Sequence, residues 1–430
     1  MRTSSTSNDR VQQPERAYLL AVETRGTAWT VGESLDELEE LTRTAGATVV
    51  GRMSQRLEKP DPRSYFGKGK LEEAAQELKA ADADVVIVDD ELPPSAGKVI
   101  EEALGTRVVD RTLLILDIFA QRARTREGRV QVDLARLEYV LPRLTRAWSH
   151  LERQGGGIGL RGGPGETQIE IDRRLIRARI SALREEIEGI RKHRSAQRSA
   201  RRRVGMPVVA LVGYTNAGKS TLFNALSRAE AVAEDKLFAT LDPLTRRVSL
   251  PGGMEVLLSD TVGFIAKLPT GLVAAFRATL EELEEANLLL HVVDITSRRA
   301  EERASIVREV LGELGVGETP VLNVLNKADL LAASREELEA TLTDARAADS
   351  VVVSAARDWN LDELAERVEV MLQREFEEVR VRIPYTETQL VDLFHRRGTV
   401  HSERHTEHGT VIRGTLPARI APRFKTFAFR

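Results

Sequence analysis

The sequence contains no cysteine, so a disulfide framework, a thiolate nucleophile and a thiolate-bound metal are all excluded. Its longest apolar runs are far too short to cross a bilayer. The first fifteen residues are polar and lack the apolar stretch of a signal peptide. Together these absences predict a cytoplasmic protein that is not inserted into a membrane.

The net charge of −3 conceals an uneven distribution. Residues 121–204 contain 21 Lys and Arg against 10 Asp and Glu, a formal charge of +11, so the rest of the chain carries −14. Within this segment, residues 191–203 hold seven Lys and Arg and no acidic residue. Such a division indicates that one segment binds a polyanion, although residues 191–203 also suit a solvated helix end or a linker.

The order of strand-like and helix-like segments predicts a multidomain α/β protein of five parts. A disordered polar tail over residues 1–15 precedes a small N-terminal α/β domain with a mainly parallel sheet over residues 16–120. Residues 121–204 form a basic helical hairpin. A larger α/β domain over residues 205–376 follows, with a mostly parallel sheet and helices on both faces. The chain ends in a small α+β domain over residues 377–430, where two strands flank a helix.

The hairpin prediction depends on two apolar seams. Four leucines between residues 134 and 144 share one helix face. Over residues 169–190, isoleucine and leucine recur at spacings of three, four and seven, as in a coiled coil. The two helices should pair in antiparallel fashion, and the glycine-rich residues 155–165 then form the tip, away from the hydrophobic cores.

Two local patterns in the N-terminal domain predict more specific features. Ser34 and Glu37 have the spacing of a capping box at the start of a helix. The segment "YFGKGK", residues 65–70, lies at a loop-to-helix junction, where it could hold an anion at the helix N-terminus. Because it is only half of a phosphate-loop pattern, an ordinary turn explains it equally well.

A phosphate-binding loop opens the larger domain. The segment "GYTNAGKS", residues 213–220, matches G-x-x-x-x-G-K-[ST] between a strand and a helix, which is the context that this motif requires. Backbone N–H groups would hold the α- and β-phosphates, Lys219 would reach the β- and γ-phosphates, and Ser220 would bind Mg²⁺. The residues expected to contact the nucleotide are Gly213, Tyr214, Thr215, Asn216, Ala217, Gly218, Lys219, Ser220 and Thr221.

Two further segments fit the switches of a nucleotide hydrolase. "DTVG" supplies an acidic strand end for the metal and, at Gly263, an N–H for the γ-phosphate. "FATLDP" lies between this motif and the phosphate loop, and Thr240 is its candidate second Mg²⁺ ligand, with Thr245 as the rival. Lys219, Thr240 and Gly263 are therefore the predicted catalytic residues. The two segments add the nucleotide-binding candidates Phe238, Ala239, Thr240, Leu241, Asp242, Asp260, Thr261, Val262 and Gly263.

The base specificity follows from "NKAD" and "SAA". Asp329 can accept hydrogen bonds from the N1–H and N2–H₂ edge of guanine, which adenine lacks, while Asn326 and Lys327 tie the loop to the phosphate loop and pack on the base. The SAA residues Ser354, Ala355 and Ala356 can offer a backbone N–H to guanine O6. Residues 205–376 are therefore predicted to be a P-loop GTPase domain that uses GTP and Mg²⁺.

One departure affects the mechanism. Many GTPases carry, directly after D-x-x-G, a glutamine that orients the attacking water, and here that position is Phe264. Hydrolysis should therefore be slow in the isolated protein. We also form the hypothesis that Asn216 helps to bind a K⁺ ion between the phosphates, as in several related GTPases.

Together with "YFGKGK" and "GGGIGLRGGPGETQIEIDRR", these motifs resemble those of the HflX family of ribosome-associated GTPases. The nucleotide motifs alone are typical of translational-type GTPases in general, and "RGGPGETQ" narrows the resemblance to this family. The usual tip reads R-G-P-G-E-T-Q, and this chain has one glycine more, at Gly162 and Gly163. The resemblance covers nearly the whole chain.

The resemblance implies that the protein binds the large ribosomal subunit, with its rRNA and ribosomal proteins as partners. It also implies that the protein splits stalled or idle ribosomes under heat or antibiotic stress. In this family the N-terminal region docks on rRNA, and the hairpin tip reaches toward the peptidyl-transferase centre. Arg161, Arg173 and Arg174 would then contact phosphates. We expect a monomer.

Two alternatives remain open. One is an ATP-dependent RNA- or ribosome-remodelling factor that uses the N-terminal domain as a second nucleotide site, with Asp89 or Asp90 at its strand end. The other is a binder for ribosome assembly or hibernation, in which GTP only times release. Subunit separation measured on intact ribosomes would distinguish both from a splitting factor.

Overall fold

The computed structural model describes residues 14–24, 30–144, 168–204, 206–228, 237–238, 240–241, 244–267, 283–341, 349–374, 376–418 and 420–429. The glycine-rich tip and all but the last two residues of the predicted tail lie outside this part of the chain. The chain divides into two compact units, each discontinuous in sequence. The first comprises Met1–Gln121 and Arg136–Ile176, and the second Arg122–Ala135 and Arg177–Arg430.

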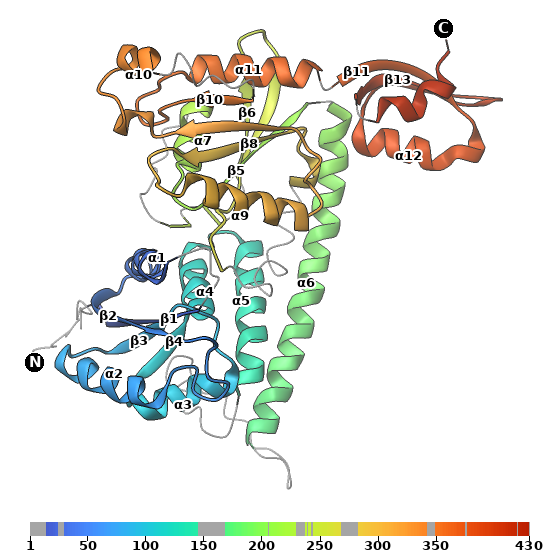
Figure 1. The fold of residues 1–430 in the computed structure, drawn as a ribbon. Coiled ribbons are helices and arrows are strands. Elements are labelled where there is room, and N and C mark those ends of the chain that lie inside the picture. The colour runs from blue at the N-terminus through green and yellow to red at the C-terminus, as the bar shows by residue number, and fades with distance from the viewer. Residues whose placement is uncertain are drawn as a thin grey trace, which may run out of the picture. The chain divides into compact units, whose positions relative to one another are not determined.

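The first unit contains a four-stranded parallel sheet with packed helices (Figure 1). Its strands are β1 (Arg16–Glu23), β2 (Thr48–Arg56), β3 (Val85–Val88) and β4 (Arg107–Asp110), in the order β2-β1-β3-β4. Its helices include α1 (Val31–Thr44), α2 (Lys68–Ala80), α3 (Pro94–Leu104) and α4 (Arg111–Arg122). Every residue of β3 is buried, as expected for a central strand of a parallel sheet covered by helical crossovers.

The helix start predicted from Ser34 and Glu37 is wrong by one turn. α1 begins at Val31, and the capping box is formed by Thr30 and Glu33. Both pairs have the same three-residue spacing, so the sequence pattern alone does not separate them. Ser34 and Glu37 do not cap the helix. Both are buried inside the unit, where they bind other polar side chains.

Their contacts form a buried ion cluster around Arg111. The Arg111 Nη1 atom donates to Asp89 Oδ1 over 2.8 Å, and its Nη2 atom pairs with Glu37. The hydroxyl of Ser34 donates to Asp89 as well. The Arg111 side chain is only 1% exposed, so two carboxylates compensate one fully desolvated cation.

The "YFGKGK" segment forms a turn whose polar groups bind residues on either side of it in the sequence. The backbone N–H of Gly67, which precedes α2, donates to Gln55 Oε1 over 2.9 Å. Lys70 pairs with Glu73 at 3.0 Å, within α2 itself. Of the two interpretations of this segment, these contacts favour the ordinary turn.

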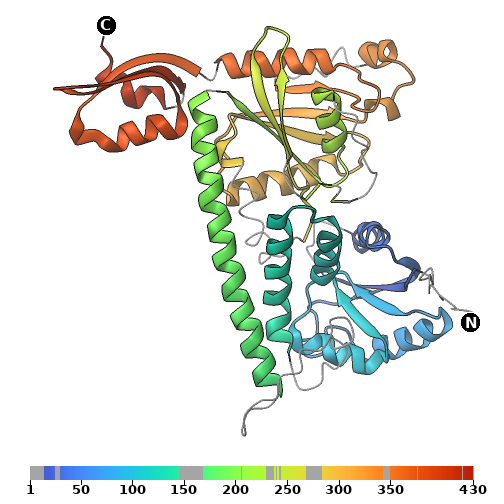
Figure 2. The same ribbon diagram turned by 180° about the vertical axis from the view of Figure 1, so that it is seen from behind.

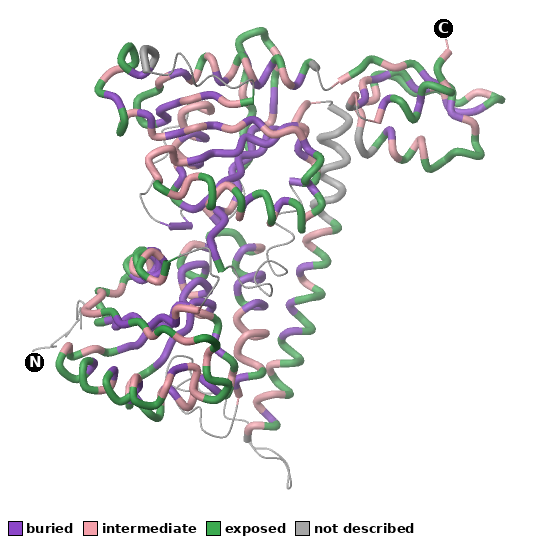
Figure 3. The backbone as a smooth tube through the Cα atoms, viewed as in Figure 1, coloured by how far each residue is buried: buried purple, intermediate pink, exposed green. Residues whose placement is uncertain are grey.

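The second unit contains a six-stranded sheet. Its strands are β5 (Val208–Gly213), β6 (Leu244–Ser249), β7 (Glu255–Asp260), β8 (Leu288–Asp294), β9 (Val321–Asn326) and β10 (Ser350–Val352), in the order β10-β9-β8-β5-β7-β6. All of them are parallel except β6. The central strands β5 and β8 are almost entirely buried, whereas the edge strand β6 is mostly exposed (Figure 3). The chain order reverses beside β5, so the loop after β5 lies at the point where open α/β sheets bind ligands.

Helices cover both faces of this sheet, as predicted. The helices are α7 (Lys219–Ser227), α9 (Ala300–Glu313), α10 (Arg335–Thr341) and α11 (Leu361–Arg374). Leu222 of α7 and Leu364 of α11 join one apolar cluster with Leu211 of β5. α9 packs on β5 and β8 with Val307 and Leu311 buried, on the opposite side of the sheet in both views (Figures 1 and 2).

The basic segment forms the predicted antiparallel helix pair, α5 (Arg126–Val140) and α6 (Gln168–Val204). In the second unit Arg126 pairs with Glu186 at 2.8 Å, and in the first Arg173 donates to the carbonyl of Leu144 over 2.6 Å. From the first contact to the second, the residue number increases on the α5 side and decreases on the α6 side, as expected for antiparallel helices. The two helices lie side by side in both views (Figures 1 and 2).

The chain ends in an antiparallel three-stranded sheet in the order β11-β13-β12. Its elements are β11 (Phe376–Ile383), α12 (Thr388–Arg397), β12 (Thr399–Thr406), β13 (Gly409–Pro417) and the 3₁₀ segment η6 (Ala421–Phe427). One sheet face packs on α12 and η6 around Phe394 and Phe424, whose rings meet edge to face. In the part of the chain that the structure describes, no helix is both long and apolar enough to cross a membrane.

Candidate nucleotide-binding site

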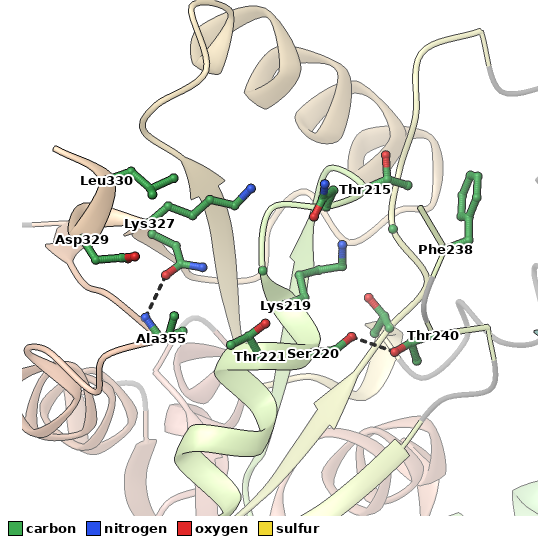
Figure 4. A pocket seen from close by; sticks show the side chains of 16 residues that line it. Thr215, Lys219, Ser220, Thr221, Phe238, Thr240, Lys327, Asp329, Leu330 and Ala355 are labelled. Carbon is green, nitrogen blue, oxygen red and sulfur yellow. Dashed lines mark hydrogen bonds between the residues drawn. The ribbon is translucent and has the colours of Figure 1, made fainter. Parts of the chain in front are cut away.

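A cavity of about 250 Å³ opens at the carboxyl ends of the central strands (Figure 4). Four loops form it, and they follow β5, β7, β9 and β10, while the segment before β6 closes one side. Its lining residues are Thr215, Asn216, Gly218, Lys219, Ser220, Thr221, Phe238, Thr240, Thr261, Gly263, Asn326, Lys327, Asp329, Leu330, Ala355 and Ala356.

The phosphate loop needs glycine at two positions. Gly218 has φ +91°, and a Cβ there would lie 2.2 Å from Asn326 Nδ2. Gly213 has φ +153°, and its Cβ would lie 2.3 Å from the carbonyl oxygen of Val292. A side chain at either position would displace its neighbours. Because both residues are glycine, the loop can close tightly over the start of α7.

Lys219 is the buried cation of the site. Its Nζ atom donates to the carbonyls of Gly213 (3.1 Å) and Tyr214 (2.8 Å). Burial lowers the pKa of Lys219 to about 8, and the negative charge of Asp260 opposes this shift. A phosphate group would supply the charge that the carbonyls only partly offer, so this ammonium group is placed to bind an anion.

Three oxygen groups converge where a metal is expected. Ser220 Oγ and Thr240 Oγ1 are 2.8 Å apart, and both donate to Asp260 Oδ2, over 2.9 and 2.8 Å. Asp260 is fully buried, and burial raises the pKa of its carboxyl group against the opposing effects of Lys219 and the two hydroxyls. Its Oδ1 atom is buried without a hydrogen-bond partner among the described residues.

This donor set fits Mg²⁺, which prefers hydroxyl, carboxylate and water oxygens. Ser220 and Thr240 would hold the ion, with Asp260 directly behind them, and the ion would neutralise charge on the β- and γ-phosphates. The geometry favours Thr240 over its rival, because Thr245 lies in β6 and its hydroxyl donates to Ser259 Oγ over 3.5 Å.

The base side of the cavity is organised by Asn326. Its Nδ2 atom donates to the Ala217 carbonyl over 2.9 Å, and its Oδ1 atom accepts from the Ala355 N–H over 3.0 Å. One amide thus ties together the phosphate loop, the β9 loop and the β10 loop. Asp329 accepts from Ser354 Oγ over 2.6 Å, so this hydroxyl orients the carboxylate that would read guanine.

The second switch, which is the segment that begins with "DTVG", is bonded to the phosphate loop near its start. The N–H of Thr215 donates to the Phe264 carbonyl over 2.7 Å, and the N–H of Phe264 donates to the Gly213 carbonyl over 3.1 Å. A third bond runs from the Ala266 N–H to the hydroxyl of Tyr214, over 2.7 Å. The Phe264 side chain is buried and does not line the cavity.

Most of the chain resembles one set of known proteins. Its consecutive segments match three family models: GTP-binding GTPase N-terminal (residues 32–120), GTP-binding GTPase Middle Region (122–201) and 50S ribosome-binding GTPase (208–327). The GTPase HflX of Caldanaerobacter subterraneus is 49% identical over 92% of this chain and 90% of its own length. The GTPase HflX of Escherichia coli is 44% identical over 88% of each chain. The chain belongs to the HflX family.

Among solved structures, a GTP-binding protein from the archaeon Sulfolobus solfataricus in complex with GDP is 25% identical, with a TM-score of 0.42. The alignment covers 84% of this chain and 99% of that one.

As an HflX-family GTPase, the protein binds GTP with Mg²⁺ and hydrolyses GTP to GDP and phosphate.

The structure distributes the sequence-derived candidates between the cavity and its support. Most of them line the cavity, and Ala239 and Asp242 lie outside the described residues. The rest do not line it: Gly213, Tyr214, Ala217, Leu241, Asp260, Val262 and Ser354. Leu330 was not among the predicted residues, although it lines the base side of the cavity and is 66% exposed. Its place directly after "NKAD" was the signal that could have found it.

Proposed function

We propose that this HflX-family GTPase binds the large ribosomal subunit in its GTP-bound state and splits stalled or idle ribosomes. The work would take place in the cytoplasm under stress such as heat or antibiotics. The ribosomal RNA and proteins of the large subunit are the proposed partners, and the protein acts as a monomer. The name of the matching family model, 50S ribosome-binding GTPase, supports a ribosomal partner.

The observation that carries the proposal is the connection between α6 and the nucleotide site. α6 runs without a break over 37 residues, or about 55 Å at 1.5 Å per residue. It ends at Val204, and β5 begins at Val208 and leads into the phosphate loop at its other end. One continuous basic helix therefore joins the glycine-rich segment to the element that holds the phosphates.

The incomplete catalytic centre also supports a large partner. Phe264 occupies the position at which many GTPases have a water-orienting glutamine, and its side chain is buried. The free protein should therefore hydrolyse GTP slowly. We propose that the large subunit raises kcat about a hundredfold or more, as other trans-acting partners do. Coupling hydrolysis to the ribosome in this way would keep GTP bound until the partner is reached.

Ribosome profiles on sucrose gradients test the proposal. Intact ribosomes are incubated with the protein and with GTP, a non-hydrolysable GTP analogue or ATP, and free subunits are quantified. GTP and the analogue should both yield subunits, whereas ATP should not. A protein that binds ribosomes without separating them would instead be an assembly or hibernation binder.

A variant with residues 155–165 replaced by a short Gly-Ser linker provides the matched control. It should keep its affinity for GTP and its slow free hydrolysis, because these residues are remote in sequence from the nucleotide motifs. It should lose subunit separation and respond weakly to the ribosome. Splitting at the parent rate by this variant would contradict the role proposed for the tip.

The ATP-dependent alternative gains no support from the first unit. Asp89, which would be needed at a second nucleotide site, is committed to Arg111 and Ser34 in the buried ion cluster. Lys70 of the half phosphate-loop pattern pairs with Glu73. The gradient experiment with ATP would overturn this interpretation if ATP alone produced subunits.

A further inference from the structure

The open face of the C-terminal sheet carries arginines in an ordered pattern. Along β11, Val381 and Ile383 are buried against α12 and η6, whereas Arg380 and Arg382 are exposed. Because side chains alternate between the two faces of a strand, both arginines point away from the core. The open face is defined here by the outward residues of β11, β13 and β12.

Strand pairing extends the pattern to the neighbouring strands. Arg413 of β13 lies directly opposite Arg380, and Val411 lies opposite both Arg382 and Arg404 of β12. Arg404 and Arg413 are exposed as well. Four guanidinium groups therefore share one side of a three-stranded sheet, with neighbouring strands about 5 Å apart.

An aromatic ring fixes two of these arginines. The C-terminal segment continues the sheet beyond β11, because Ala428 bridges to Val381 and the Phe429 N–H donates to the Arg380 carbonyl over 3.2 Å. The guanidinium carbons of Arg380 and Arg382 both lie 4.7 Å from the centre of the Phe429 ring. The ring holds their positions while leaving their N–H groups available.

Little negative charge competes for this face. Among the described outward residues of the three strands, the single carboxylate is Glu378, which pairs with Arg413 at 2.8 Å. Both of these side chains are about 60% exposed, so the ion pair contributes little to stability. Another anion can therefore replace Glu378 as the partner of Arg413. No ion pair of Arg380 or Arg382 occurs among the described residues.

We propose that this open face binds the phosphate backbone of RNA. Planar guanidinium groups match phosphate oxygens with two parallel hydrogen bonds, and an aromatic ring among them offers a surface for stacking a base. The proposal deepens the proposed function, since the ribosomal partner exposes RNA. The open face contains no residue of the hairpin and no residue that lines the nucleotide site.

The test compares two double substitutions of equal charge in the full chain. Arg380→Gln with Arg382→Gln alters the open face. Arg423→Gln with Lys425→Gln alters η6, on the other side of the same sheet, where both residues are exposed. Binding of a fluorescently labelled single-stranded RNA is followed by anisotropy over a range of KCl concentrations. Both pairs are measured in a background whose hairpin is neutralised at residues 201–203, to reduce competing binding.

The open-face variant should bind more weakly, and the slope of log K against log [KCl] should fall by about 1.4 units, since each phosphate contact in a single strand contributes roughly 0.7. The η6 control should change the slope by less than about 0.5 units. Phe429→Leu removes no charge and should weaken binding about two- to fivefold at an unchanged slope.

Three results would overturn the proposal. Equal losses in both double variants would show a general charge effect, and unchanged binding in the open-face variant would show that the face does not contact RNA. Unchanged RNA binding together with lost binding to RNA-free ribosomal proteins would assign the face to a protein partner. Basal GTP hydrolysis serves as the folding control, and the outcome does not depend on ribosome splitting.

Discussion

Tyr214 is expected to be a positioning residue for GTP hydrolysis. Its hydroxyl accepts the Ala266 N–H over 2.7 Å, two residues beyond Phe264 and three beyond Gly263. Its ring lies 4.9 Å from the guanidinium carbon of Arg303, so the side chain is anchored on its other side by α9. Tyr214→Phe would remove the hydroxyl and keep the ring contact, which isolates the tie to the second switch.

The expected magnitude follows from a single hydrogen bond. A buried neutral bond contributes about 0.5–1.5 kcal/mol, which corresponds to a roughly 2- to 12-fold change in the population of the bonded arrangement. The rate of hydrolysis should fall by this factor, because Gly263 must offer its N–H to the γ-phosphate from this arrangement. Affinity for GDP should change less than about twofold, since Tyr214 does not line the cavity.

Single-turnover hydrolysis and fluorescent-nucleotide titrations measure the two quantities separately. Tyr385→Phe is the matched control, because that hydroxyl bonds to the Thr406 carbonyl over 2.9 Å in the C-terminal sheet, outside the nucleotide site. The reasoning is refuted if Tyr214→Phe hydrolyses GTP at the parent rate. It is also refuted if GDP affinity and hydrolysis fall together, which would indicate a general loss of structure.

Three further substitutions or conditions test other parts of the structure. Asp329→Asn should exchange guanine for xanthine preference by about 10-fold or more, and equal GTP affinity in variant and parent would exclude the assignment. If Asn216 helps to bind K⁺, hydrolysis should slow when Na⁺ replaces K⁺, and identical rates would rule this out. Arg111→Met should destabilise the first unit by about 3–5 kcal/mol in chemical denaturation, because the carboxylates of Glu37 and Asp89 lose their buried cation. GTP affinity should be retained, and unchanged unfolding would contradict the role given to the cluster.

All the nucleotide motifs except "FATLDP" could be located from the sequence because each is a short run directly after a strand. The carboxyl ends of parallel strands meet at one edge, so four such runs must converge there. Contacts between distant residues could not be found in this way. The bond from Ala266 to Tyr214 joins residues 52 positions apart, and the orientation of Asp329 by Ser354 depends on two different loops.

Edge strands and buried charge were the other weak points of the sequence analysis. β12 reads "TVHSERHT", with no alternation of apolar and polar residues, because it is an edge strand with most side chains exposed. The capping-box pattern at Ser34 and Glu37 was misleading because Ser34 bonds to Asp89 and Glu37 pairs with Arg111, and both partners lie far along the chain. Local spacing carries no information about such partners.

The position of Phe264 shows why one substitution should not restore rapid hydrolysis. Both main-chain groups of Phe264 are bonded to the phosphate loop, and its side chain is 2% exposed. A glutamine placed there would point into the same buried space and not toward the γ-phosphate. Phe264→Gln should therefore hydrolyse GTP no faster than the parent and should lower stability by about 1–3 kcal/mol, since a buried amide would lack hydrogen bonds. Single-turnover rates and thermal unfolding measure both effects. Rapid hydrolysis by the free variant would show that the second switch leaves the phosphate loop when GTP binds, and that the missing side chain alone limits the reaction.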